Sequence, residues 1–125
     1  METKTMKILV IDDEVEVGSF LCDFLKRLGL EAQKATNGEE ALKMFASIKP
    51  DWVFLDLKMP DIDGLEVLRR MKEIDPGIQA LMITGRDDEL SENEAHALGA
   101  RDYLIKPVDL DELRTKIKKY ILDGQ

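Results

Sequence analysis

Several features that mark special classes of protein are absent or scarce in this sequence. The chain has 125 residues and one cysteine, Cys22, so no internal disulfide can form. No apolar run approaches the roughly 18 residues that a membrane-spanning helix needs, and the first residues do not resemble a signal peptide. We therefore expect a cytoplasmic protein that makes no membrane contact and is stabilised by its hydrophobic core.

Basic residues are also in the minority. The sequence holds 18 Lys and Arg residues against 26 Asp and Glu residues, with a formal net charge of −8. Direct binding of nucleic acid needs a basic surface, so we expect none. With 44% hydrophobic and 35% charged residues, the composition is typical of a folded domain. The length suits a single domain over residues 1–125, with its core over about residues 6–122.

Short apolar runs followed by amphipathic segments recur along the chain. Unbroken runs at residues 8–11, 52–55 and 80–83, with a shorter one at 103–105, are typical of parallel strands covered on both faces. The segment 31–35 is more polar and suits a strand at the edge of a sheet. Segments that alternate in this way are typical of right-handed strand–helix–strand crossovers.

Helical patterns lie between these runs. One apolar stripe at helical spacing ends at Gly29, a fourth helix is expected to end at Gly99, and another stripe begins at Leu110. Three helix starts, including that of the stripe at Leu110, are marked by a capping oxygen three residues before an acid, at Asn37 with Glu40, Asp63 with Glu66, and Asp109 with Glu112. The pattern predicts an α/β fold, a doubly wound sandwich of five strands alternating with five helices.

Ligands of such a sheet bind at the carboxyl ends of its strands, so the residues there are candidates for a site. These residues are Asp12 and Asp13, Asp56, Thr84 and Gly85, and Lys106 and Pro107. Three carboxylates, a hydroxyl and an ammonium group therefore converge on one edge of the predicted sheet. A helix-capping role would explain Asp13 alone, but it does not explain this convergence.

Together these segments resemble the receiver domain of two-component response regulators. The matching stretches are residues 8–13 with their paired acids, 56–64, 84–85 and 99–107. The resemblance implies a flavodoxin-like five-stranded parallel sheet in the order 2-1-3-4-5. It also implies a signalling switch that takes a phosphoryl group from a histidine kinase onto Asp56.

The resemblance further implies a magnesium site. Asp13, Asp56 and the backbone carbonyl of Lys58 would bind Mg²⁺ directly, and Asp12 would hold a water of its shell. Mn²⁺ is expected to substitute for Mg²⁺. Without a metal ion the three carboxylates face one ammonium group, that of Lys106. A cation is therefore needed before a dianionic phosphoryl group can approach.

The remaining roles that the resemblance implies concern the phosphoryl group and the switch. Lys106 would neutralise one phosphoryl oxygen and the Thr84 hydroxyl would donate to another. Gly85 would leave room for the incoming group, and Tyr103 would fill the space that Thr84 leaves as it moves. Two further features are a cis peptide bond between Lys106 and Pro107, and long cationic side chains at the mouth of the site, Lys58 and Arg86.

A protein of this kind is a switch rather than an enzyme in the usual sense, although it promotes its own phosphorylation and dephosphorylation. Its expected phosphodonor is a sensor histidine kinase or a phosphotransfer protein. Its expected target is an effector protein or an output domain in a longer chain. The surface of the fourth helix, fifth strand and fifth helix is implied to change on phosphorylation and to serve for docking or homodimer formation.

Other classes of protein fit these residues less well. A calcium-binding loop over residues 59–70 lacks acidic residues at its ends, where Met59 and Arg70 stand. An aspartate-nucleophile phosphatase would carry two aspartates with one residue between them, whereas Asp12 and Asp13 are adjacent, and it would need a cap domain. A flavin or nucleotide binder would carry a glycine-rich loop after the first strand. An interaction module that keeps the fold without being phosphorylated stays open, and a small phosphodonor distinguishes it from a switch.

Overall fold

Five parallel strands form one sheet in a computed structural model that describes residues 5–85, 93, 96–97 and 99–123. The strands are β1 (Lys7–Ile11), β2 (Glu31–Ala35), β3 (Trp52–Asp56), β4 (Gln79–Thr84) and β5 (Asp102–Ile105). Their order across the sheet is β2-β1-β3-β4-β5, which confirms the predicted fold. The polar strand β2 lies at an edge, as its composition indicated.

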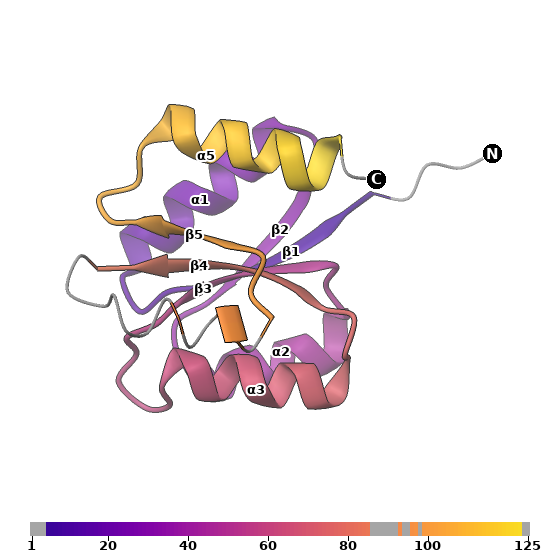
Figure 1. The fold of residues 1–125 in the computed structure, drawn as a ribbon, viewed down its shortest axis with the longest axis vertical. Coiled ribbons are helices and arrows are strands. Elements are labelled where there is room, and N and C mark those ends of the chain that lie inside the picture. Colours follow the sequence, from indigo (N-terminus) through magenta and orange to yellow (C-terminus); the bar gives the residue numbers. More distant parts are fainter. Residues whose placement is uncertain (1–4, 86–92, 94–95, 98, 124–125) are drawn as a thin grey trace.

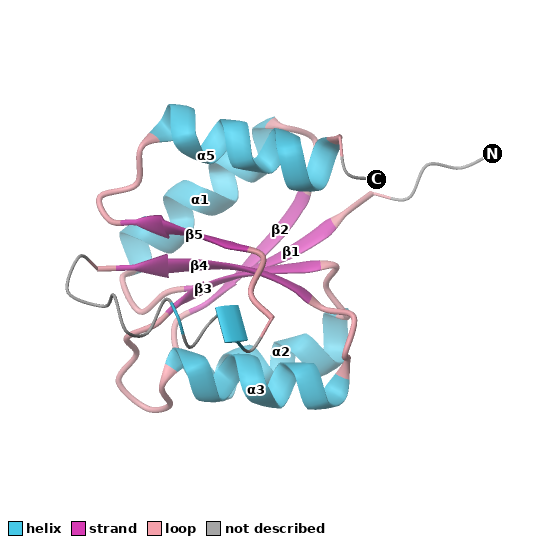
Figure 2. Ribbon diagram, viewed as in Figure 1, coloured by secondary structure: helices cyan, strands magenta, loops and turns pink. Residues whose placement is uncertain are grey.

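Helices cover both faces of the sheet in two layers (Figures 1 and 2). They are α1 (Val15–Arg27), α2 (Gly38–Ile48), α3 (Gly64–Ile74) and α5 (Leu110–Ile117), which continues as the π-helical turn η1 (Lys118–Leu122). The helices α1 and α5 lie on one face, and α2 and α3 lie on the other. Most of the expected fourth helix falls outside the described residues, but Asn93, His96 and Ala97 are helical.

Burial on both faces explains why the strand sequences are unbroken apolar runs. In β1, Leu9 and Ile11 belong to the apolar cluster beneath α2 and α3, whereas Ile8 and Val10 belong to the cluster beneath α1 and α5. All four side chains are at most 1% exposed. A strand with one solvent-exposed face would have needed polar residues at every second position.

The predicted helix caps are present. Asn37, Asp63 and Asp109 precede α2, α3 and α5, and the side chain of each accepts a backbone N–H hydrogen bond of 2.7–3.0 Å. The first helix begins differently, because its N-cap residue is Glu14 rather than Asp13. Asp13 is therefore not needed as a cap and can serve the strand-end site.

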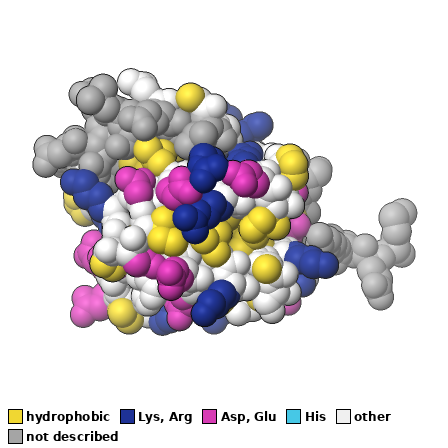
Figure 3. Space-filling view, turned by 90° about the horizontal axis from the view of Figure 1, so that it is seen from below, with side chains coloured by type: hydrophobic (Ala, Val, Ile, Leu, Met, Phe, Trp, Pro, Cys, Tyr) yellow, Lys and Arg dark blue, Asp and Glu magenta, His cyan; other side chains and the backbone are white. Residues whose placement is uncertain are grey.

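The outer surface of α3 is charged. Arg69 pairs with Glu66 and Glu73, and Arg70 pairs with Glu66, all within the same helix. Solvent screens exposed pairs of this kind, so they contribute little to stability. Figure 3, seen from the side of α2 and α3, shows acidic and basic side chains intermixed. Within the described residues, no helix is both long enough and apolar enough to cross a bilayer.

Candidate functional site

The carboxyl ends of the strands bring the predicted site residues to one edge of the sheet (Figure 1). Ile11 pairs with Leu55 across β1 and β3, so Asp12 follows β1 directly beside Asp56, the last residue of β3. Asp56 in turn pairs with Ile83 of β4. Strand register therefore places side chains that are 44 positions apart in the sequence at neighbouring points of the site.

Asp12, Asp13 and Asp56 form a compact carboxylate cluster. One carboxylate oxygen of each lies within 4.8 Å of those of the other two. Asp12 and Asp56 are 1% and 5% exposed, whereas Asp13 is exposed. Burying carboxylates this close together is unfavourable unless a cation compensates their charge.

Lys106 supplies one such cation. Its Nζ lies 3.1 Å from Asp12 Oδ2, 3.2 Å from Asp56 Oδ2 and 2.9 Å from Glu14 Oε1. Burial disfavours the charged ammonium, but the hydrogen bond to Glu14 and the neighbouring carboxylates of Asp12 and Asp56 outweigh it and raise the pKa of Lys106. The Lys106–Pro107 peptide bond is cis, as the resemblance implied. Lys106 is therefore a permanent positive charge facing the cluster.

Glu14 was not anticipated from the sequence. It is the third acid in a row after β1, and this run was the only local sign of its role. Its backbone N–H donates to Asp12 Oδ1 at 2.9 Å while its carboxylate accepts from Lys106. Glu14 therefore links the first and last strand ends of the site.

The carboxyl group of Asp56 has an unusual proton affinity. Burial and then the charge of Asp12 raise the pKa of Asp56 to about 6, although Lys106 and the backbone N–H of Lys58 act in the opposite direction. Lys58 N donates to Asp56 Oδ1 at 3.2 Å. Asp56 therefore exchanges its proton just below neutral pH in the metal-free protein, and a bound cation would favour its ionised form.

The donor set of this cluster fits Mg²⁺. Asp12 Oδ2 is buried and accepts no hydrogen bond from any described residue. Its contact with Lys106 Nζ is an ion pair. With Glu14 included, four carboxylates face one ammonium group, so the site has a surplus of negative charge. Hard oxygen ligands of this kind are those that Mg²⁺ prefers.

The loop after Asp56 turns back tightly on the strand. The backbone N–H of Gly64 donates to the carbonyl of Leu57 at 2.9 Å. A Cβ atom at Gly64 would lie 2.4 Å from the carbonyl oxygen of Asp56. Only glycine allows this approach, so Gly64 lets α3 begin directly beside the site.

The other predicted site residues are described fully, in part or not at all. Thr84 ends β4 and pairs with Ile105, but its side chain and the whole of Arg86 lie outside the described residues. Gly85 follows as a half-buried residue. Tyr103 is half-buried on β5, and its ring lies 5.8 Å from that of His96 in an edge-to-face contact.

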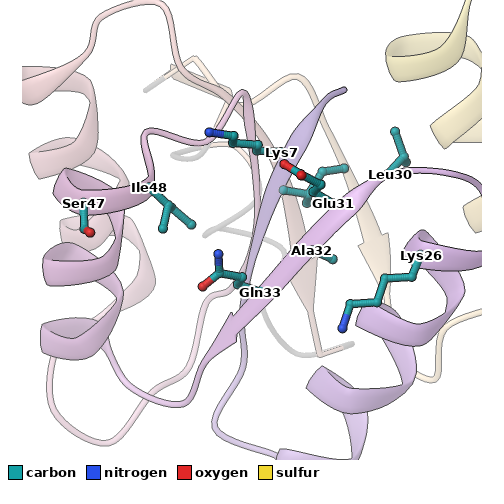
Figure 4. A pocket seen from close by; sticks show the side chains of 9 residues that line it. Lys7, Lys26, Leu30, Glu31, Ala32, Gln33, Ser47 and Ile48 are labelled. Atoms are coloured by element: carbon teal, nitrogen blue, oxygen red, sulfur yellow. The ribbon is translucent and has the colours of Figure 1, made fainter. Parts of the chain in front are cut away.

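Two hollows lie at opposite ends of the sheet. One, of about 630 Å³, lies along the edge strand β2 near Lys7 and Glu31, the first residues of β1 and β2 (Figure 4). It is therefore at the amino ends of the strands, away from the carboxylate cluster. The other, of about 480 Å³, adjoins the site and is lined by Glu14, Val17, Phe20, Lys106, Pro107 and Val108.

Comparisons with known proteins identify the family. The model for the response regulator receiver domain matches residues 8–118. The chain is 37% identical over 115 residues to sporulation initiation phosphotransferase F of Bacillus subtilis, which covers 92% of this chain and 93% of that protein. A solved response regulator receiver domain protein from Clostridium thermocellum is 34% identical, with a TM-score of 0.87 over 95% of this chain and 96% of that one. This chain belongs to the receiver domains of two-component response regulators.

Other relatives are longer than this chain. The regulatory protein AtoC of Escherichia coli is 37% identical over 117 residues, but the match covers only 25% of AtoC against 94% of this chain. The chain spans about a quarter to a half of several such relatives. Family membership implies signalling through a phosphoaspartate rather than membership of a classical enzyme family. Receiver domains bind Mg²⁺ through an acidic cluster, and Asp12, Asp13 and Asp56 form one here.

Proposed function

We propose that this chain is a phosphoryl-accepting switch, with Asp56 as the acceptor in a reaction that depends on Mg²⁺. One observation carries the proposal. The buried carboxylate of Asp56 lies in a cluster with Asp12 and Asp13 and is 3.2 Å from the ammonium group of Lys106. A buried nucleophile between acidic metal ligands and a fixed cation is suited to accept a dianionic group.

Phosphoryl transfer to Asp56 forms an acyl phosphate. One carboxylate oxygen of Asp56 attacks the phosphorus atom, and the bond from phosphorus to the donor oxygen or nitrogen breaks. The leaving group keeps the electron pair of that bond. Such a transfer requires in-line positioning and charge neutralisation more than covalent help from the protein.

Each residue of the site has a part in this positioning. Asp13, Asp56 and the carbonyl of Lys58 would hold Mg²⁺, with Asp12 orienting its shell. The ion, when bound, supplies charge neutralisation for the phosphoryl oxygens. Lys106 already faces Asp56 and would pair with a phosphoryl oxygen after transfer. The remaining oxygen would accept a hydrogen bond from the hydroxyl of Thr84, and Gly85 would leave room for the donor.

Tyr103 is proposed to carry the change to the surface. Lys116 of α5 donates to the backbone carbonyl of Tyr103, and its Nζ lies 5.4 Å from the centre of the Tyr103 ring. Movement of the ring toward the space vacated by Thr84 would therefore disturb a contact with α5. The altered surface of the fourth helix, β5 and α5 would then bind an effector, an output domain or a second copy. The phosphoryl group shifts this balance only as far as it stabilises one state more than the other.

The apolar hollow beside the site is proposed to receive the phosphodonor protein, a histidine kinase or a phosphotransfer protein. The hollow shares Glu14 and Lys106 with the site, so a protein seated there would have its phosphohistidine next to Asp56. Phe20 lines the hollow and is 43% exposed, and Val15 on the same helix is 57% exposed. Exposed apolar side chains beside a reaction site favour a protein partner over solvent.

Lys58 and Arg86 are proposed to slow hydrolysis of the phosphoaspartate. Lys58 is exposed two residues beyond the acceptor, and Arg86 stands two residues beyond Thr84 in the sequence. The family resemblance implies that both side chains lie at the mouth of the site, where two long cations would obstruct the attacking water. Replacing both with alanine should therefore shorten the lifetime of the phosphorylated form.

The acceptor is tested by mass spectrometry after treatment with acetyl phosphate and Mg²⁺. The wild type should gain one phosphoryl group, and Asp56→Asn should gain none while keeping its fold. Asp23→Asn, an exposed aspartate on α1, is the matched control and should react like the wild type. Undiminished phosphorylation of Asp56→Asn would exclude Asp56 as the acceptor. A wild type that takes no phosphoryl group from acetyl phosphate or from a phosphohistidine donor would favour the interaction module instead.

A further inference from the structure

The loop that follows the acceptor is bound to the start of α2 by one carboxylate. Asp61 Oδ1 accepts from the backbone N–H of Gly38 at 2.9 Å, and Asp61 Oδ2 accepts from the backbone N–H of Glu39 at 3.0 Å. Both bonds join residues more than 20 positions apart. They lower the pKa of Asp61, so its carboxylate is ionised at neutral pH.

These bonds complete the capping of α2. The first amides of a helix have no partner within the helix. The N-cap residue Asn37 serves only one of them, because its Oδ1 accepts from Glu40 N at 2.8 Å. The carboxylate of Asp61 accepts hydrogen bonds from the first two amides of α2, and a negative charge at this end is also favourable for the helix dipole. The start of α2 therefore depends on a side chain of the acceptor loop.

Side-chain packing brings the same two segments together. A Cβ atom at Gly38 would lie 2.9 Å from Cβ of Ile62 and 3.0 Å from a methyl group of Val67. Ile62 is the residue after Asp61, so the loop contacts α2 through both a polar and an apolar side chain. Because no Cβ atom fits at Gly38, the loop and the start of α2 are closely packed, which limits movement of the loop relative to α2.

The ends of the loop are fixed at the site itself. Lys58 N donates to Asp56 Oδ1 at 3.2 Å, and Gly64 N donates to the carbonyl of Leu57 at 2.9 Å. Between these ends, Asp61 bonds the loop to another element, the start of α2. We propose that Asp61 is a positioning residue that holds the acceptor loop so that the carbonyl of Lys58 is directed into the magnesium site. This inference rests on the proposed function of that site.

The test compares two variants that each remove part of the α2 cap. Asp61→Ala removes the two hydrogen bonds that join the acceptor loop to α2. Asn37→Ala removes a capping bond of α2 but leaves the bonds between the loop and α2 in place. Calorimetric titration of the full chain with Mg²⁺ should show about tenfold weaker binding for Asp61→Ala, the lower end of the loss seen when groups that support metal ligands are removed. Asn37→Ala should keep the wild-type affinity. Asp61→Asn retains one acceptor oxygen and should bind Mg²⁺ with intermediate affinity.

A second measurement needs no metal. Amide hydrogen exchange in the metal-free protein should be faster at Lys58 and Gly64 in Asp61→Ala than in Asn37→Ala or the wild type. Equal Mg²⁺ affinities in all variants, or equal losses in Asp61→Ala and Asn37→Ala, would overturn the positioning role. If the wild type binds no Mg²⁺, the proposed function fails by itself. Unchanged exchange in the loop would then overturn the positioning role separately, and faster exchange would show that Asp61 holds the loop.

Discussion

Lys106 Nζ lies 3.2 Å from Asp56 Oδ2, although 50 positions separate the two residues in the sequence. The same ammonium group is 3.1 Å from Asp12 Oδ2. In the metal-free protein Lys106 therefore compensates part of the charge that a metal ion would otherwise neutralise. A bound cation and Lys106 interact with the same carboxylates, so the free energy of metal binding depends on the charge of Lys106.

Replacing Lys106 with alanine should separate metal binding from phosphorylation. Loss of the ammonium group removes a positive charge that repels Mg²⁺, so the affinity should rise about tenfold, equivalent to about 1.4 kcal/mol. Phosphorylation by acetyl phosphate should slow, because a phosphoryl oxygen loses its counter-charge. Calorimetry and mass spectrometry measure the two effects. Weaker Mg²⁺ binding by Lys106→Ala in a folded protein would show that Lys106 supports the metal site instead.

Asp13 and Asp12 should differ in their effect on Mg²⁺ binding. Asp13 is exposed and has no capping role, so its carboxylate is available as a direct ligand. Asp12 is buried, and its oxygens already meet Glu14 N and Lys106. Asp12→Ala should weaken binding about tenfold, as loss of a supporting group does, and Asp13→Ala should weaken it further. Titration calorimetry of both variants provides the comparison, and equal affinities in the two variants and the wild type would contradict the assigned ligands.

Phe20→Ala should impair transfer from a protein donor alone. Truncating an apolar side chain that anchors a docking interface costs at least about 1 kcal/mol of binding. Transfer from a histidine-phosphorylated donor protein should therefore slow, whereas acetyl phosphate should react at the wild-type rate. Ile74→Ala is the matched control, because Ile74 is an exposed apolar residue on α3. Similar slowing with both donors would place the effect of Phe20 in the site rather than in docking.

Asp102 should contribute stability that depends on pH. Burial disfavours its ionised form, but hydrogen bonds from Tyr103 N and the Tyr120 hydroxyl, together with Lys116, outweigh burial and lower the pKa of Asp102 below 3.8. A lowered pKa means that the contribution is complete above the unfolded value of 3.8 and is lost as the pH falls through the folded value.

Urea unfolding of the wild type and Asp102→Asn measures this contribution. The wild type should be more stable by up to about 1 kcal/mol at pH 7, since asparagine keeps one acceptor oxygen for the Tyr103 amide but loses the ion pair with Lys116 and the second carboxylate oxygen, which accepts from the Tyr120 hydroxyl. The difference should shrink at pH 3, where Asp102 of the unfolded chain is protonated. A difference that stays constant between the two pH values would show that Asp102 acts through packing rather than charge.

Much of the fold could be predicted from the sequence, because local rules determine where strands and helices form. Strands buried on both faces must be apolar throughout, and helix starts need an oxygen near their first amides, so the apolar runs and the caps Asn37, Asp63 and Asp109 were identifiable. The observed strand β4 extends one residue beyond the predicted run at each end, because pairing continues into polar residues such as Gln79 and Thr84. Apolar periodicity established only that strands and helices alternate, and the strand order was inferred from the family resemblance.

The site was likewise determined partly by local sequence features and partly by long-range contacts. The sequence by itself determined that Asp12, Asp13 and Asp56 stand at the carboxyl ends of strands, since an acid directly after an apolar run is a local feature. Only the tertiary structure decided that Glu14 meets Lys106 across 92 positions and that Asp61 caps α2 across more than 20. The partners of an exposed carboxylate depend on strand register and loop path, which no pattern near that residue encodes.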